Sequence, residues 1–204
     1  MKKQIIVIHG GKVFDTQKEY LAYLRGYKIN IEKLKTKGWK EKLADRLGKN
    51  FEIIAPRMPN PANAKYKEWK IMFEKLFPFL QGNLVLLGHS LGGVFLAKYL
   101  SENKFPKKIK ATFLVAAPYY GETEKKTMAG FILPKKLDKF QAQGGKIYLY
   151  HSKNDKVVSF ANCKEYKNEL PEAEMVTFRS RGHFDQAAFP ELIANIKKLS
   201  NSLF

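Results

Sequence analysis

Ser90 lies between two glycines in the stretch Gly88-His89-Ser90-Leu91-Gly92, directly after a short apolar run. A serine hydroxyl is a weak nucleophile near neutral pH, so it needs a base to take its proton and a third group to orient that base. The pattern G-x-S-x-G between a strand and a helix is typical of a sharp turn that exposes such a serine. The same letters also fit a plain turn before a buried helix. We interpret Ser90 as a candidate nucleophile.

His183 is the candidate base for Ser90. It follows the last apolar run and lies on a loop before the last helical segment, where an imidazole could reach the hydroxyl. Where such a turn carries the nucleophile, the order along the chain is serine, then acid, then histidine. The other histidines are interpreted differently: His9 positions its loop, His89 packs or forms a hydrogen bond, and His151 is a satisfied residue at the end of a strand.

Asp155 is the candidate acid, because it comes just after an apolar run in the stretch YLYHSKNDKVVS. Asp185 is the fallback, although it is only two residues from the candidate base His183 and therefore too close in sequence to be the usual orienting group.

An oxyanion hole requires two preorganised N–H donors where charge develops in the transition state. The amide of Leu91 is one candidate. The second is the amide of Gly11, with Gly10 or Lys12 as alternatives, since glycines allow the backbone to approach a substrate closely.

The elements that must position these residues alternate along the chain. Apolar runs predict buried strands at residues 4–9, 51–55, 83–87, 111–116, 146–150 and 175–178. Helical spacing predicts helices at residues 39–47, 66–80, 91–102, 160–170 and 189–199. The alternation predicts one α/β domain over residues 1–204, a three-layer α/β/α sandwich around a mostly parallel sheet of about six strands. Residues 12–38 and 119–143 fit poorly, and long connections of this kind often form lids or pocket walls.

Composition limits the binding partners, the cysteine chemistry and the location that the protein can have. The formal net charge of +18 comes mainly from scattered lysines, so we expect weak attraction to polyanions rather than specific nucleic-acid recognition. The single cysteine, Cys163, excludes an intramolecular disulfide and a cysteine-rich zinc site. No apolar stretch is long enough to span a membrane, and the run after Lys3 is too short for a signal peptide, so a cytoplasmic location is expected.

Several other residues are interpreted as structural. We expect Trp39 and Trp69 to anchor the core, residues 58–61 to form a rigid loop, and Cys163 to be buried or half-buried in a helix.

The order of motifs resembles the small, capless serine hydrolases of the α/β-hydrolase superfamily, of the retinoblastoma-binding protein nine and YdeN type. The matching stretches are IHGG, WKEKL, RMPNP followed by Trp69, GHSLGG, residues 119–131, SKNDKVVSF, and GHF followed by FPEL. In this family the nucleophile, acid and base fall on Ser90, Asp155 and His183.

The resemblance implies hydrolysis of a small-molecule carboxylic ester, thioester or amide through an acyl-enzyme, with no metal or organic cofactor. Residues 12–38 are longer than the usual loop of the family, which leaves the substrate-binding residues undefined. Two alternatives stay open: a protein-interaction module on a hydrolase scaffold with little turnover, and a basic protein that binds polyanions.

Overall fold

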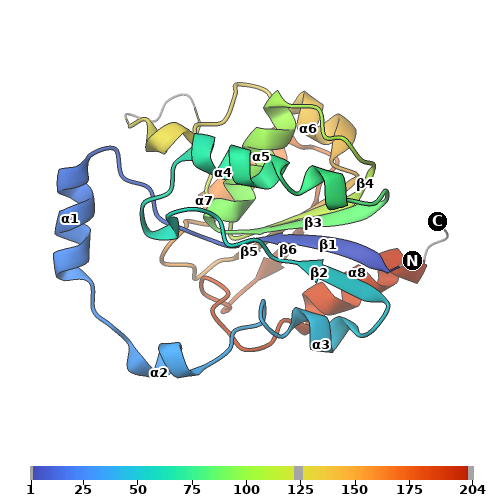
Figure 1. Ribbon diagram of the computed structural model, residues 1–204, viewed down its shortest axis with the longest axis horizontal. Coiled ribbons are helices and arrows are strands. Elements are labelled where there is room, and N and C mark those ends of the chain that lie inside the picture. The colour runs from blue at the N-terminus through green and yellow to red at the C-terminus, as the bar shows by residue number, and fades with distance from the viewer. Residues whose placement is uncertain (1, 122–125, 202–204) are drawn as a thin grey trace.

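A six-stranded parallel sheet forms the centre of the molecule in the computed structural model, which describes residues 2–121 and 126–201 (Figure 1). Its strands follow the order β2-β1-β3-β4-β5-β6, and every neighbouring pair is parallel. The strands are β1 (Lys3–Ile8), β2 (Phe51–Ile54), β3 (Leu84–His89), β4 (Ile109–Val115), β5 (Lys146–Ser152) and β6 (Glu174–Phe178). The six strands predicted from the apolar runs are confirmed, with ends shifted by one or two residues.

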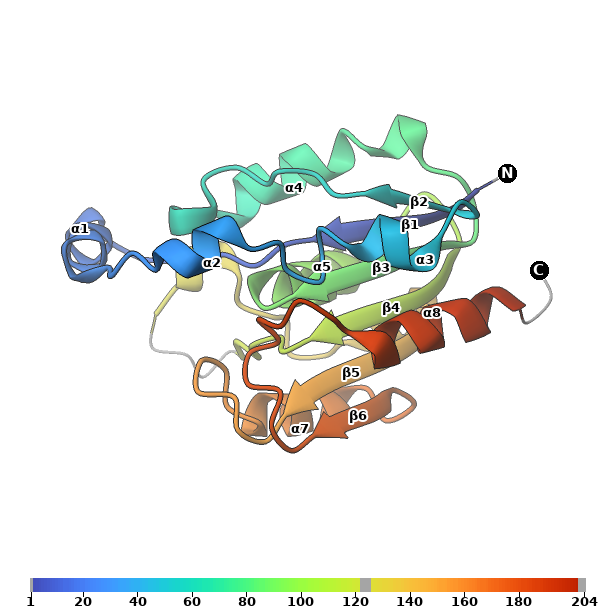
Figure 2. The same cartoon turned by 90° about the horizontal axis from the view of Figure 1, so that it is seen from below.

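Helices cover both faces of the sheet, as Figures 1 and 2 show. One face carries α4 (Tyr66–Glu74), α5 (Leu91–Glu102), α6 (Asp138–Gln143) and α7 (Ala161–Glu169), and the other carries α3 (Leu43–Leu47) and α8 (Pro190–Asn201). The predicted three-layer α/β architecture is confirmed. Within the described residues, no helix is long and apolar enough to cross a membrane.

The sheet is buried on both faces because successive side chains of a strand point to opposite sides. In β1, Ile6 and Ile8 belong to the core under α4 and α5, whereas Ile5 and Val7 belong to the core under α3 and α8. Trp69 lies in the first core and Trp39 in the second, so each tryptophan is a core anchor, as expected from the sequence.

Two predicted helices are shorter in the structure. The segment predicted at residues 39–47 is helical only from Leu43, because residues 39–42 form turns in which the amides of Lys42 and Leu43 donate to carbonyls three residues earlier, at 3.2 and 3.3 Å. The segment predicted at residues 66–80 ends its α-helix at Glu74 and continues as a short 3-10 turn at Phe77–Phe79. Pro78 lacks the N–H that a regular helix would need there.

The two stretches that fit the alternation poorly contain helices that were not predicted. Residues 12–38 carry α1 (Gln17–Gly26) and α2 (Ile31–Lys35), and residues 119–143 carry α6; residues 122–125 of this second stretch lie outside the described residues. We call residues 14–37 the arm. In Figures 1 and 2 its helix α1 stands apart from the layers of the sheet and helices.

Candidate active site

Ser90 occupies a strained turn between β3 and α5. Its backbone has φ 55° and ψ −123°, in the region of positive φ that residues other than glycine rarely adopt. The Ser90 amide donates to the carbonyl of Val115 in β4 at 2.8 Å, which ties the turn to the neighbouring strand. Since β3 is buried along its whole length, the turn follows directly from the rigid centre of the sheet.

The glycines on either side of Ser90 are required by close approaches of the backbone. A Cβ atom on Gly92 would lie 2.2 Å from the carbonyl oxygen of Ile8, and one on Gly88 would lie 2.4 Å from the carbonyl oxygen of Gly92. Both distances are far below van der Waals contact, so the turn can be this sharp only with hydrogen at these positions.

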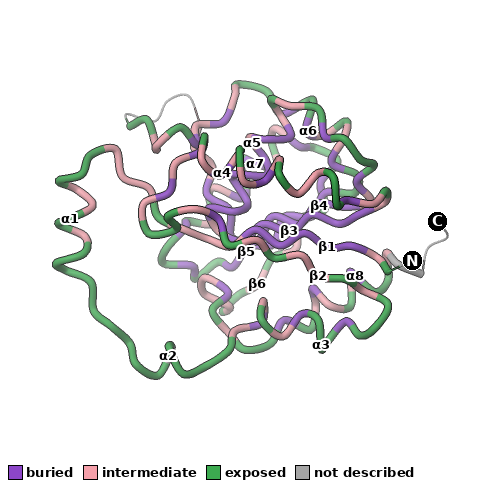
Figure 3. Tube along the Cα trace, in the orientation of Figure 1, coloured by how far each residue is buried: buried purple, intermediate pink, exposed green. Residues whose placement is uncertain are grey.

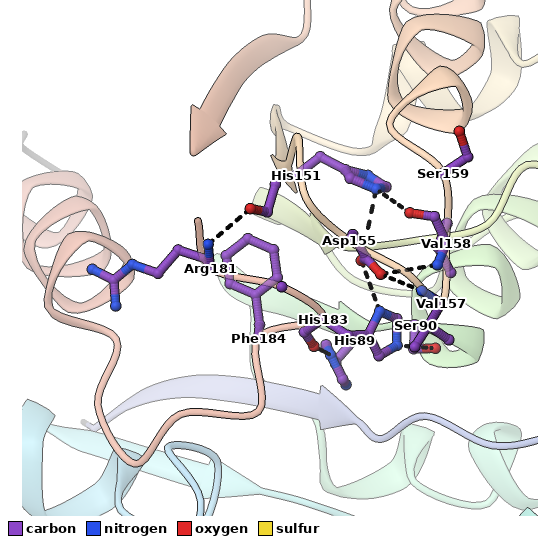
Figure 4. Close-up of polar contacts among 12 residues, drawn as sticks. His89, Ser90, His151, Asp155, Val157, Val158, Ser159, Arg181, His183 and Phe184 are labelled. Carbon is purple, nitrogen blue, oxygen red and sulfur yellow. Dashed lines mark hydrogen bonds and ion pairs between the residues drawn. The ribbon is translucent and has the colours of Figure 1, made fainter. Parts of the chain in front are cut away.

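The three candidate residues for proton transfer meet at the carboxyl edge of the sheet (Figure 4). The Oγ atom of Ser90 lies 3.0 Å from Nε2 of His183, and Nδ1 of His183 lies 2.8 Å from Oδ2 of Asp155. Asp155 comes from the loop after β5, and His183 comes from the loop between β6 and α8. The structure thus brings together, in one hydrogen-bonded row, three residues that lie up to 93 positions apart.

The Asp155 carboxylate is fully buried and makes several hydrogen bonds. Its Oδ1 accepts from the amides of Val157 and Val158 at 2.8 and 2.9 Å, while Oδ2 faces His183. His151 approaches to 3.8 Å, but its Nε2 donates to the carbonyl of Val158 at 2.9 Å. His151 is therefore a satisfied histidine beside the acid, as the sequence suggested.

The loop that carries His183 is fixed from several sides. The indole N–H of Trp39 donates to the carbonyl of Phe184 at 2.8 Å, and the side-chain amide of Gln186 donates to the carbonyl of Arg181 at the same distance. Phe184 itself is buried and has φ 56°. The imidazole of His183 is consequently held in place while 13% of its side chain stays exposed.

His89 and Lys40 support this loop in a way that the sequence did not reveal. His89 donates from Nε2 to the carbonyl of His183 at 2.9 Å, and its Nδ1 accepts from the ammonium of Lys40 at 3.1 Å. Burial lowers the pKa of His89 well below its usual range, and the neighbouring Lys40 and His183 lower it further. Burial also lowers the pKa of Lys40. A neutral His89 with one donor and one acceptor nitrogen satisfies both contacts.

The loop after β1 contains Gly10 and Gly11, and we call it the glycine loop. It lies directly against the turn of Ser90. A Cβ atom on Gly10 would lie 3.1 Å from the Cβ of Ser90, and one on Gly11 would lie 3.0 Å from Cδ2 of Leu91. The amide of Lys12 donates to the carbonyl of Pro61 at 2.8 Å, which removes it as an oxyanion donor. Among the described residues, no hydrogen bond uses the amide of Gly11 or of Leu91.

His9 and the loop of residues 58–61 hold this glycine loop. His9 accepts from the amide of Met58 at 2.9 Å through Nε2 and donates from Nδ1 to the carbonyl of Gly10 at 2.7 Å. The indole N–H of Trp69 fixes the carbonyl of Pro59 at 2.8 Å. These contacts agree with the structural roles expected for His9 and for residues 58–61.

A cavity of about 310 Å³ opens onto Ser90. Its walls are mainly apolar and come from the glycine loop, the arm, the loop after β4, the segment around Met128 and the loop after Asp155: Gly11, Lys12, Val13, Phe14, Tyr23, Leu91, Pro118, Tyr120, Met128, Val157 and Val158. A larger cavity of about 440 Å³ lies between α3 and α8, but Ser90 does not line it. Of these two cavities, the smaller one alone gives access to the candidate nucleophile.

Buried histidines make the fold sensitive to acid. Burial lowers the pKa of both His89 and His151, so the unfolded chain binds more protons than the folded one below the usual histidine pKa of about 6.5. We expect the free energy of unfolding in urea to fall as the pH drops from about 7 to 5, by up to roughly 1.4 kcal/mol per pH unit for each histidine. His151→Gln, whose amide can still donate to Val158, should show a shallower fall. An identical slope in the two proteins would contradict this assignment.

The sheet order, the covering helices and the strained serine turn define an α/β hydrolase. Comparison of structures agrees: the ydeN gene product from B. subtilis has a TM-score of 0.72 at 18% identity, over 98% of this chain and all of that one. A carboxylesterase structure from Nitrososphaera gargenis has a TM-score of 0.62 at 14% identity, over 99% and 92% of the two chains.

Sequence comparison gives the family. The chain belongs to the serine hydrolase family, whose model matches residues 29–198. It is also similar to the serine hydrolase RBBP9 of Rattus norvegicus, with 25% identity over 170 residues that cover 79% of this chain and 84% of the relative. The resemblance found in the motifs is thereby confirmed, and the protein is a serine hydrolase.

Proposed function

We propose that the protein hydrolyses small carboxylic esters, thioesters or amides through an acyl-enzyme formed on Ser90. The observation that carries this proposal is the hydrogen-bonded row from Ser90 Oγ through His183 to the Asp155 carboxylate, with distances of 3.0 and 2.8 Å. Its geometry matches the distances that proton transfer from a nucleophile to a base requires.

In the first half of the reaction, His183 takes the proton of Ser90 as the hydroxyl oxygen attacks the carbonyl carbon. Asp155 holds the imidazole in the tautomer with the proton on Nδ1 and stabilises the imidazolium that forms. The amides of Leu91 and Gly11 donate to the oxyanion of the tetrahedral intermediate. Protonated His183 then gives its proton to the leaving alcohol, thiol or amine.

In the second half, His183 takes a proton from water, and the resulting hydroxide attacks the acyl-enzyme. The tetrahedral intermediate collapses with release of a carboxylic acid, and His183 returns the proton to Ser90. No step needs a group beyond these side chains, the two amides and water.

The cavity walls indicate the kind of acyl group. Val13, Phe14, Met128 and Val158 present apolar surface. The one charged side chain of the described lining is Lys12, whose ammonium lies 5.4 Å from the centroid of the Tyr23 ring. We therefore propose a neutral, apolar acyl group of modest size. Rates across a chain-length series of acyl esters and thioesters should pass through a maximum where the acyl chain fills the cavity.

A fluorophosphonate probe tests the nucleophile directly. We expect one equivalent of probe on Ser90 of the folded protein, located by mass spectrometry of peptides, and none after unfolding. Cys163 is no competing nucleophile, because it is buried and burial raises its pKa to about 12. If Ser90 stays unlabelled while a known serine hydrolase in the same tube reacts, the hydrolase scaffold serves binding rather than turnover.

His89 acts in this proposal as a positioning residue for the base. His89→Leu leaves the carbonyl of His183 and the ammonium of Lys40 without their partner, so we expect kcat to fall about 10- to 100-fold with KM little changed. His89→Gln can donate to that carbonyl and accept from Lys40, and it should recover most of the rate. Equal losses in the two variants, at equal melting temperature, would show that His89 only fills space.

A further inference from the structure

The arm exposes apolar side chains that the described part of the protein does not cover. Figure 3 shows it exposed along most of its length. Ten large hydrophobic side chains are exposed among the described residues, and six of them belong to the arm: Leu21, Leu24, Tyr27, Ile29, Ile31 and Leu34. Leu34 is 74% exposed and Ile29 is 67% exposed. Apolar side chains gathered in this way on one segment mark an interaction surface.

The arm is an organised structure rather than a loose loop. Thr16 and Glu19 form a capping box at the start of α1, and the rings of Phe14, Tyr20, Tyr23 and Tyr27 contact one another in a row. No residue of α1 is buried. The helix is therefore formed and oriented without the apolar burial that normally stabilises an amphipathic helix.

The acidic residues at the base of the arm hold it to the segment before α6. Asp15 accepts from the Thr127 hydroxyl at 2.7 Å and from the Ala129 amide at 3.1 Å. Glu19 pairs with Lys126 at 2.6 Å. These two carboxylates are thus turned toward the protein and leave the outer part of the arm to its cations.

The outer part of the arm is basic. Lys18, Arg25, Lys28 and Lys37 are exposed, and no carboxylate of the described residues forms an ion pair with them. Glu32 pairs with Lys35 at 3.0 Å, so its charge is compensated locally. Exposed leucine and isoleucine side chains, tyrosines and unpaired cations therefore occur together on one protruding segment.

We propose that the arm is a docking element for an anionic lipid bilayer. Its leucine and isoleucine side chains would enter the boundary between headgroups and acyl chains, while its cations would lie at the anionic headgroups. A second copy of the chain is a poorer partner, because each copy carries a formal charge of +18 and two like-charged surfaces repel. This inference concerns binding alone and does not depend on the reaction proposed for Ser90.

Cosedimentation of the full chain with vesicles tests the proposal. We expect binding to vesicles of phosphatidylcholine mixed with phosphatidylglycerol, weak binding to phosphatidylcholine alone, and the same result for Ser90→Ala. The triple variant Ile29→Ser, Ile31→Ser, Leu34→Ser should bind roughly tenfold more weakly or worse, since it removes much of the apolar contact. Because these side chains are exposed, the substitutions should leave the melting temperature unchanged.

Matched variants away from the arm serve as controls. Ile71→Ser, Phe79→Ser, Met175→Ser removes three exposed apolar side chains elsewhere, and it should bind like the wild type. Arg25→Gln, Lys28→Gln, Lys37→Gln should lose about fivefold per cation, whereas Lys104→Gln, Lys107→Gln, Lys108→Gln, in the segment before β4, should lose much less.

Three results would overturn the proposal. The first is equal binding to both vesicle compositions or to neither. The second is an equal loss in the arm variants and in their matched controls, which would mean that the total charge alone attracts the bilayer. The third is a change of oligomeric state in the Ile29, Ile31 and Leu34 variant, measured by light scattering, without a change in vesicle binding, which would make a second copy the partner.

Discussion

Ser90→Ala should lower the rate of ester hydrolysis by about 10⁶-fold, to the level left by substrate binding and the oxyanion donors alone. The reason is that no other nucleophile is in reach: among the described residues, Ser90 is the only one hydrogen-bonded to the His183 imidazole on its cavity side. The rate should be measured as single-turnover release of p-nitrophenol from a short acyl ester, so that slow steps after acylation do not mask the loss.

The matched control for Ser90→Ala is Ser159→Ala, which removes a hydroxyl from the loop after Asp155 without touching the nucleophile. It should retain nearly the full rate. Ser90→Ala should also keep the melting temperature of the wild type or exceed it, because the new side chain is smaller than the one that the strained turn already holds. Residual turnover within tenfold of the wild type would contradict the assignment of Ser90.

Asp155→Asn should lower kcat by about 10⁴-fold while leaving the fold intact. The amide can no longer accept the Nδ1 proton of His183 as a carboxylate does, so the imidazole loses the tautomer that can take a proton from Ser90. A side-chain carbonyl in place of Oδ1 can still accept from the amides of Val157 and Val158. The loss should therefore appear in kcat rather than in the melting temperature or KM.

Asp185→Asn is the control for charge near the base. Asp185 is two residues from His183 and faces Lys40, whereas Oδ2 of Asp155 lies 2.8 Å from Nδ1 of His183. We expect less than a fivefold change in kcat for this variant. A larger loss for Asp185→Asn than for Asp155→Asn would move the acid to Asp185.

The three candidate catalytic residues could be predicted from the sequence, whereas the residues that hold them in position could not. Ser90, Asp155 and His183 follow from residue type, chain order and position after strands, because parallel strands deliver their following loops to one edge of the sheet. Lys40 could not be found in this way. Its contact with His89 spans 49 residues and depends on how the turn after Trp39 packs, which no local pattern encodes.

The start of helix α1 in the arm, in contrast, has a local signal in the sequence. Thr16 and Glu19 have the spacing of a capping box, and the structure places a helix directly after Thr16. Its apolar residues do not predict a core-facing helix, and no residue of α1 is buried by the described part of the protein. The position of α1 outside the layers depends on the distant contacts of Asp15 and Glu19 with residues 126–129, which the sequence alone does not pair.

The order of the strands gives the three residues of the site unequal protection against local opening. Ser90 follows β3, an inner strand that is buried along its whole length, whereas His183 follows β6, an edge strand in which no residue is buried. Edge elements open at lower free energy than the centre of a sheet. Detachment of β6 alone would separate the base from a nucleophile that is still in place. Catalytic competence therefore rests on an edge strand of the sheet, and the fold as a whole can survive conditions under which the reaction has already stopped.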